Sequence, residues 1–152
     1  MVRPLLSMGL LLLLVALPPA QASLNAGPAT TDIQVPFDVT VEYDQPPFES
    51  LDFSGMMHVN TQVTPKGSIR IRVNLDGVSA FGPETGTRYN AVGRDEATAP
   101  FGTLITPTLD FRVVPASGTI LSCILEVKLV LTFSASGQLT NVYIDHAEVV
   151  PF

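Results

Sequence analysis

The alternation of apolar and polar residues with a period of two is the feature that most constrains the fold of this chain. In its longest run, Thr119 to Phe133, every odd-numbered residue from Leu121 onward is apolar. Successive side chains of an extended strand point to opposite faces, so this run predicts a strand with one buried face at the centre of a sheet. No amphipathic helical pattern of useful length follows the first 22 residues. The chain is therefore predicted to be all-β.

Three shorter runs, Val35 to Tyr43, Leu51 to Thr64 and Ser68 to Asp76, also carry their apolar residues at odd positions. Matching the apolar faces of the second and third runs requires a three-residue loop, Pro65-Lys66-Gly67, with Gly67 in the left-handed region. The predicted pairs of this hairpin are Thr64 with Ser68, Val63 with Ile69, Val59 with Val73, Gln62 with Arg70, Asn60 with Arg72 and His58 with Asn74.

The chain between Gly77 and Val114 is less regular. Its glycines and prolines predict a loop up to Gly86, and a short strand, Thr87 to Gly93, precedes a polar loop, Arg94 to Pro100. Phe101 to Val114 is predicted to be the next strand, in which Pro107 requires an edge position or a bulge because proline cannot donate to a ladder.

The register of the last strand, Gln138 to Val150, stays open. A three-residue turn before it pairs Leu129 with Tyr143, whereas a two-residue turn pairs Leu129 with Ile144. A bulge near Asn141 would reconcile the two registers.

Seven strands joined mostly in sequence predict a single-domain antiparallel meander that forms a β-barrel or a near-closed barrel, because closure removes exposed strand edges. A two-sheet β-sandwich is the alternative. We assign residues 1–22 to a signal peptide, 23–34 to a flexible N-terminal segment and 35–152 to the antiparallel β domain.

The N-terminus reads as a secretory leader. Arg3 precedes an apolar stretch, Leu10 to Leu17, and the small residues Ala20 and Ala22 form a cleavage pattern. Cleavage after Ala22 would leave a secreted or periplasmic chain without a membrane span, since the apolar stretch is shorter than the roughly 20 residues that a span needs.

The charge of the mature chain limits its partners. Of the eight Lys and Arg residues Arg3 lies in the leader, so seven basic residues face fourteen Asp and Glu. This acidic balance argues against nucleic acid and anionic membrane, both of which need a basic face. The single Cys123 has no partner for an internal disulfide and lies on the apolar face of its strand, so we expect an inert, buried thiol.

The stretch GPETGTRYN, Gly82 to Asn90, contains PETG, the core of a sortase anchoring signal. Such a signal needs a Leu-Pro lead, an apolar span and a basic tail, and the residues around PETG lack them. We therefore interpret the stretch as a turn.

The same stretch carries a resemblance to known proteins. The chain resembles a loosely defined group of small exported bacterial β-proteins without assigned function in the segments Thr85-Gly86-Thr87-Arg88-Tyr89, Gly93 and Ser136-Gly137. The likeness covers most of the chain from Val35 to Val150 and rests on turn glycines and one tyrosine. It implies that a final hairpin closes the domain, and it carries over no catalytic or binding residue.

Few residues of the chain could act in catalysis or metal binding. His58 and His146 lie on different predicted hairpins without ligand spacing, and no nucleophile elbow is present, so no catalytic residue, metal ligand or cofactor is assigned. Acidic loop residues that could bind Ca²⁺ match no known loop pattern; they are Asp76, Glu84, Asp95 and Glu96.

Five residues are candidates for ligand binding. His58, Arg70 and Arg72 belong to an outer ladder that could bind a carboxylate or a sugar. Tyr89 and Asn90 could lie at the mouth of a barrel, as could His146. Its interior could hold a small apolar ligand or be filled by side chains. The residues expected to line it are Phe53, Met57, Leu75, Phe111, Leu125 and Leu129.

These observations favour a non-catalytic binding or interaction domain, whose partner is a small apolar ligand or a protein. One alternative is a barrel-cavity enzyme of cyclase or isomerase type, although we expect that the protein is not an enzyme. The other is a structural envelope or surface protein. The oligomeric state is not indicated by the sequence.

Overall fold

A computed structural model describes residues 29–152, except 117, 119 and 121. The predicted signal peptide, residues 1–22, lies outside these residues. The described part is all-β, and in it there is no helix with the length and apolar character that a membrane crossing requires. The strands are β1 (Thr30–Glu42), β2 (Ser50–Val63), β3 (Ser68–Phe81), β4 (Arg88–Val92), β5 (Arg94–Pro100), β6 (Leu104–Ile105), β7 (Thr108–Pro115), β8 (Cys123–Phe133) and β9 (Leu139–Pro151).

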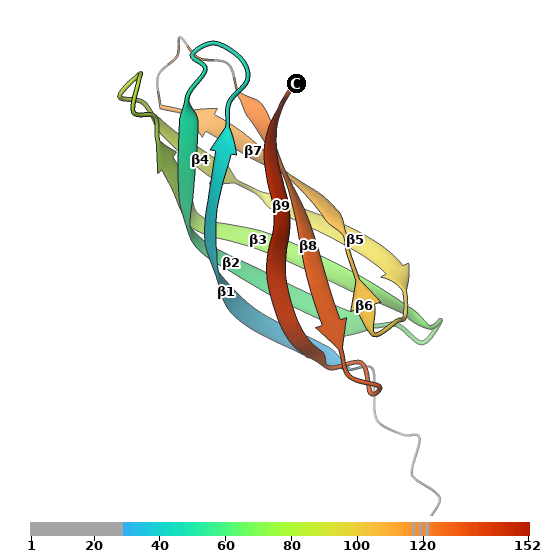
Figure 1. Cartoon of the computed structure of the whole chain (residues 1–152). Helices are drawn as coiled ribbons and strands as arrows, with labels where there is room; N and C mark the ends of the chain where they lie inside the picture. Colours follow the sequence, from blue (N-terminus) through green and yellow to red (C-terminus); the bar gives the residue numbers. More distant parts are fainter. Residues whose placement is uncertain (1–28, 117, 119, 121) are drawn as a thin grey trace, which may run out of the picture.

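The strands form one antiparallel sheet that curls into a nearly closed barrel (Figure 1). Around the barrel β1, β2 and β3 follow one another, β4 and β5 pair with opposite halves of β3, and β7 connects β4 to β8. β8 also pairs with β6 and with β9. β1 and β9 lie side by side without a ladder between them, so the barrel has an unsealed seam. The predicted barrel is thus confirmed in its near-closed form.

The apolar faces predicted from the alternation enclose the core. Every odd-numbered residue of β8 is at most 3 % exposed, and β8 lies in the interior of the sheet as expected. The six residues expected to line the interior are buried too, and Phe53, Met57, Leu125 and Leu129 have no exposed surface at all. A cavity that held even one water molecule beside these four would give them accessible surface, so side chains fill the space between them.

The hairpin of β2 and β3 has the predicted register. Thr64 bonds to Ser68 across the turn, and the pairs from Val63 with Ile69 to His58 with Asn74 are those expected. Gly67 adopts a φ of 76°, the left-handed conformation that the loop requires.

Two segments that were predicted to be loops are strands, Val78 to Phe81 and Arg94 to Pro100, whereas Gly82 to Gly86 form a loop as expected. β3 continues through Gly77 to Phe81, since Gly77, with a φ of 63°, forms a bulge that moves the buried positions from odd to even numbers. The polar segment Arg94 to Pro100 is β5, which pairs with the first half of β3. Its alternation is weak because its inward residues include the small Ala97 and Ala99.

Three boundaries also differ from the prediction. β1 begins at Thr30, so the last part of the predicted flexible segment is strand, because Thr30 to Gln34 pair with Gln62 to His58. The single strand expected from Phe101 to Val114 is divided into β6 and β7 at Pro107. β8 begins at Cys123, and positions 119 and 121 of the predicted run lie outside the described residues.

The register of β9 combines the two alternatives. Phe133 pairs with Leu139 across a three-residue turn, an extra residue at Thr140 shifts the register, and Leu129 then pairs with Ile144. The bulge expected near Asn141 is therefore present. A second extra residue, Asp145, shifts the register again, so that Lys128 pairs with His146.

Candidate functional site

The seam between β1 and β9 exists because of strand directions. Every pair of neighbouring strands in the sheet is antiparallel, and the path from β1 to β9 crosses six such pairs, through β2, β3, β4, β7 and β8. An even number of reversals leaves β1 and β9 running in the same direction. Antiparallel pairing therefore cannot continue across the seam, and parallel pairing is slightly less stable per residue.

The free edge of β1 can be assigned residue by residue. Tyr43 donates its amide to the carbonyl of Glu49 at 2.9 Å, on the β2 side. In an antiparallel pair the residues that bond to the neighbour alternate with residues whose amide and carbonyl point the other way. The backbone groups of Thr40 and Glu42 consequently face the seam. Pro36, which has no amide to donate, occupies another of these even positions in β1.

The free edge of β9 follows from the bonds of β8. Leu129 donates its amide to the carbonyl of Pro107 at 3.0 Å, so the odd residues of β8 bond away from β9. Their partners in β9, Ile144 and Ala147 among them, must direct their own amides and carbonyls toward the seam. Leu139 shows this direction at the lower end, where its amide donates to Thr31 Oγ1 of β1 at 3.3 Å.

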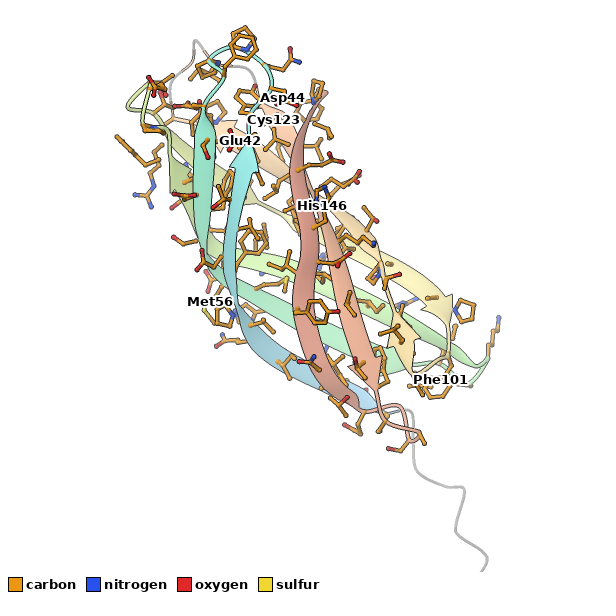
Figure 2. The ribbon with its side chains drawn as sticks, in the orientation of Figure 1. Glu42, Asp44, Met56, Phe101, Cys123 and His146 are labelled. Atoms are coloured by element: carbon orange, nitrogen blue, oxygen red, sulfur yellow. The ribbon has the colours of Figure 1, made fainter. Side chains whose placement is uncertain are left out.

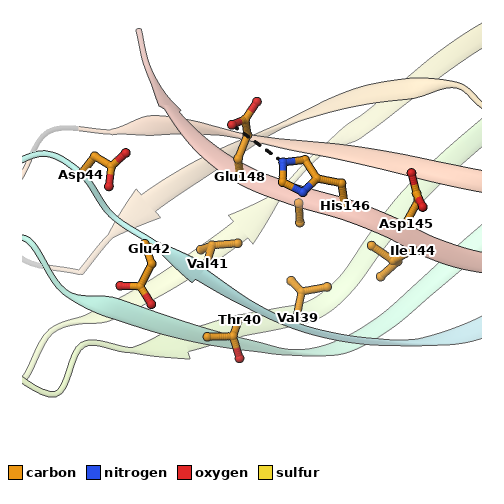
Figure 3. A pocket seen from close by; sticks show the side chains of 10 residues that line it. Val39, Thr40, Val41, Glu42, Asp44, Ile144, Asp145, His146 and Glu148 are labelled. Carbon is orange, nitrogen blue, oxygen red and sulfur yellow. Dashed lines mark ion pairs between the residues drawn. The ribbon is translucent and has the colours of Figure 1, made fainter.

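Beyond that contact the two edges enclose an open groove with a volume of about 510 Å³ (Figure 3). Its floor is apolar, because Val39, Val41 and Ile144 lie between the two strands. Most inward residues of β2, β3 and β8 are buried, whereas Val39, Ile144 and Ala147 are only partly covered. The groove therefore leaves a strip of the core without cover.

The rim of the groove is acidic. Four carboxylates line it and no Lys or Arg does; they are Glu42, Asp44, Asp145 and Glu148. Lys128 neutralises Asp145, whose Oδ2 lies 2.9 Å from Nζ. His146 Nε2 lies 3.9 Å from Oε2 of Glu148, and both side chains are more than half exposed. The rim therefore carries an excess of negative charge that faces solvent.

A second hollow of about 360 Å³ lies at the end of the barrel, next to the groove. It is lined by Tyr43, Gln45, Pro46, Ile120, Ser122, Pro151 and Phe152. Figure 2 shows Glu42, Asp44 and Cys123 at this same end of the molecule. The acidic groove thus lies next to a hollow whose lining residues include no carboxylate side chain.

The stretch GPETGTRYN surrounds a buried carboxylate. Glu49 is 2 % exposed and accepts hydrogen bonds from Tyr89 Oη at 2.5 Å, from Thr85 Oγ1 at 2.9 Å, and from the amides of Glu84 and Thr85 at 3.2 and 3.3 Å. Gly82 lies so close that a Cβ there would collide with the carboxylate of Glu49. The interpretation of PETG as a turn is confirmed.

The ionisation of this cluster is shifted from ordinary values. Burial alone would raise the pKa of Glu49, but the hydrogen bonds from Tyr89, Thr85 and Glu84 outweigh it and hold the pKa below its usual range. Burial and the bond to Glu49 raise the pKa of Tyr89. Tyr89 is 1 % exposed, so it supports the turn from inside the barrel end rather than standing at a mouth.

The other predicted ligand-binding residues lie on the outer face of the sheet. β5 brings Glu96 to the two arginines, with Oε1 3.1 Å from Arg70 Nε and Oε2 2.6 Å from Arg72 Nε. His58 contacts Gln34 at 3.0 Å and lies 3.7 Å from Asp76. His58 and Arg72 share a shallow hollow of about 400 Å³. Asn90 is half-buried in β4, away from this hollow.

Cys123 is a free, buried thiol, as predicted. Burial raises its pKa to about 11, although a hydrogen bond with Tyr43 acts in the opposite direction. Thiols react as thiolates, so this environment is that of an unreactive cysteine.

In the part of the chain that the structure describes, no three His, Cys, Asp or Glu side chains gather as a metal site. Of the four acidic residues considered for Ca²⁺, Glu96 is held by the arginines, and Asp95 accepts the amides of Glu96 and Asp110 at 2.7 and 2.8 Å. These carboxylates therefore serve separate contacts.

The residues of the seam were missed by the sequence reasoning. Thr40, Glu42 and Ala147 belong to strands that were predicted, but nothing in their alternation says which edge stays unpaired. The one available signal was Pro36 within the first strand, since proline inside a strand indicates an edge. No protein-family model, curated protein or solved structure matches this chain. The resemblance to small exported bacterial β-proteins stays a prediction.

Proposed function

We propose that this protein is an exported, non-catalytic binding domain that receives a protein partner in the seam between β1 and β9. The leader pattern of residues 1–22 supports export. The observation that carries the binding role is the pair of unpaired strand edges over a partly covered apolar strip. Exposed edges are templates for pairing with another chain, and the edges of β1 and β9 face each other without a ladder between them.

The predicted small apolar ligand has less support. The side chains expected to line a lumen fill the space between them, so a carrier would have to use the hollow beside Tyr43 and Phe152 at the barrel end. Native mass spectrometry of the secreted protein distinguishes the two: a co-purifying small molecule would favour the carrier, and a clean apo mass would favour the protein partner.

Selection of peptides from an unbiased display library tests the seam directly, with protein expressed from the full chain. We expect enriched peptides whose binding is lost in Ala147→Pro, because proline removes a donor that faces the seam. The control is Arg72→Ala, which alters the outer hollow and should leave binding unchanged. The proposal would be refuted if no peptide is enriched, or if the enriched peptides bind Ala147→Pro as well as the unaltered protein.

A further inference from the structure

The seam has a defined geometry for an added strand. Because β1 and β9 run in the same direction, one strand running opposite to both would be antiparallel to each of them. It would raise the number of strands along the path from β1 to β9 from seven to eight and close the antiparallel sheet between β9 and β1. The amides and carbonyls of Thr40, Glu42, Ile144 and Ala147 already point into the gap that this strand would occupy.

The two faces of the seam differ in chemistry. Side chains on the inner face of an added strand would pack against Val39, Val41 and Ile144, which form the floor of the groove. Side chains on its outer face would stand between the rim carboxylates of Glu42 and Glu148. Residues of a strand point alternately to these two faces.

We infer that the seam binds an extended segment of a partner protein in which apolar residues alternate with Lys or Arg, as the missing antiparallel strand of the barrel. This inference rests on the proposed function and specifies the partner's segment. Charge complementarity carries it: four carboxylates line the groove, Lys128 neutralises one of them, and no Lys or Arg lines the groove, where His146 lies 3.9 Å from Glu148.

The same charge argues for a partner rather than for a segment of this chain. Residues 23–34, which precede and begin β1, contain neither Lys nor Arg. A neutral or acidic segment would leave Glu42, Asp44 and Glu148 without a counter-charge. Two other occupants, the chain's own N-terminal residues and a second copy, remain outcomes of the experiment below.

The test uses fluorescence anisotropy with an eight-residue labelled peptide in which Lys or Arg alternates with Val or Thr. Three control peptides accompany it. One carries Glu in place of each basic residue, one has the same composition with its basic residues clustered at one end, and one is N-methylated at alternate residues and so lacks the donors for one strand edge. We expect binding of the first peptide alone.

Two protein variants locate the binding. The triple variant Glu42→Gln, Asp44→Asn, Glu148→Gln should raise the Kd about tenfold and flatten its salt dependence, because screened attraction between rim and peptide is lost. Hydrogen exchange should slow at Thr40, Glu42, Ile144 and Ala147 when the peptide binds. Removal of residues 23–28 should leave the affinity unchanged, and the protein should sediment as a monomer before the peptide is added.

Several outcomes would overturn the inference. Equal binding of the clustered or N-methylated peptide would mean that charge alone acts, without strand pairing. Tighter binding after removal of residues 23–28 would place the chain's own segment in the seam, and a dimer that the peptide dissociates would place a second copy there. If the display library instead returns seam-binding peptides without basic residues, the proposed function stands and this inference falls.

Discussion

Replacing Glu49 by glutamine tests the buried cluster that organises the turn GPETGTRYN. Glutamine keeps the size of the side chain and can still satisfy its neighbours, because its amide can donate to the hydroxyls of Tyr89 and Thr85 while its carbonyl accepts from the two backbone amides. What it loses is the negative charge. Glu49→Gln therefore isolates the contribution of ionisation from that of packing.

The expected loss follows from the contacts. A hydrogen bond to a charged group contributes about 1.5–3 kcal/mol and a neutral one about 0.5–1.5 kcal/mol. Two hydroxyls donate to Glu49 at 2.5 and 2.9 Å, so losing the charge should cost about 2 kcal/mol of the free energy of unfolding. For a domain of this size that lowers Tm by about 8 °C. Glu49→Ala leaves four donors without their acceptor and should cost about 4 kcal/mol or more.

The cluster also gives stability a pH dependence. The folded-state pKa of Glu49 lies below the ordinary value of 4.5, so its contribution is fully present above that value and is lost as the pH falls through the lower folded pKa. Urea unfolding followed by circular dichroism from pH 7 to pH 3 measures both effects. Glu49→Gln should lack this acidic component of the pH dependence.

Glu84→Gln is the matched control, because Glu84 is an exposed carboxylate of the same turn. It should unfold like the unaltered protein. The reasoning would be refuted if Glu49→Gln shows the same Tm and the same acid-induced loss of stability as the unaltered protein.

The remaining predictions concern the turn, the core and the seam. Gly82→Ala places a methyl group against the Glu49 carboxylate and should lower the free energy of unfolding in urea by about 2 kcal/mol. In the control Gly102→Ala the new Cβ would lie 3.8 Å from the carbonyl oxygen of Leu104, so the free energy of unfolding should change little. Similar losses in both variants would contradict the close approach of Gly82 to Glu49. Cys123 should react slowly with thiol reagents until denaturant is added, and rapid labelling of the native protein would count against its burial. His146→Pro should lower the thermal transition far more than Ala147→Pro, because the alternation directs the amide of His146 toward β8 and that of Ala147 toward the seam. Equal losses would show that the assignment of seam-facing amides is wrong.

Much of the fold was predictable because alternation depends on adjacent residues. The buried faces of β2, β3 and β8 and the β2–β3 register follow from side chains that are near one another in sequence and from the conformation that Gly67 allows. Predictions were wrong where a bulge changed the parity, as at Gly77, or where small inward residues weakened the pattern, as in β5. The ion pairs that Arg70 and Arg72 form with Glu96 could not be predicted while β5 was assigned to a loop.

The sequence by itself determined that this chain forms long strands with one apolar face and that PETG lies in a turn, because period and turn chemistry are local properties. Only the tertiary structure decided that Glu49 is the acceptor of that turn and that the barrel opens between β1 and β9. Both depend on which distant segments meet. The seam in particular arises because β1 and β9 run in the same direction, which depends on the number of antiparallel pairs between them. No single stretch of sequence determines that number.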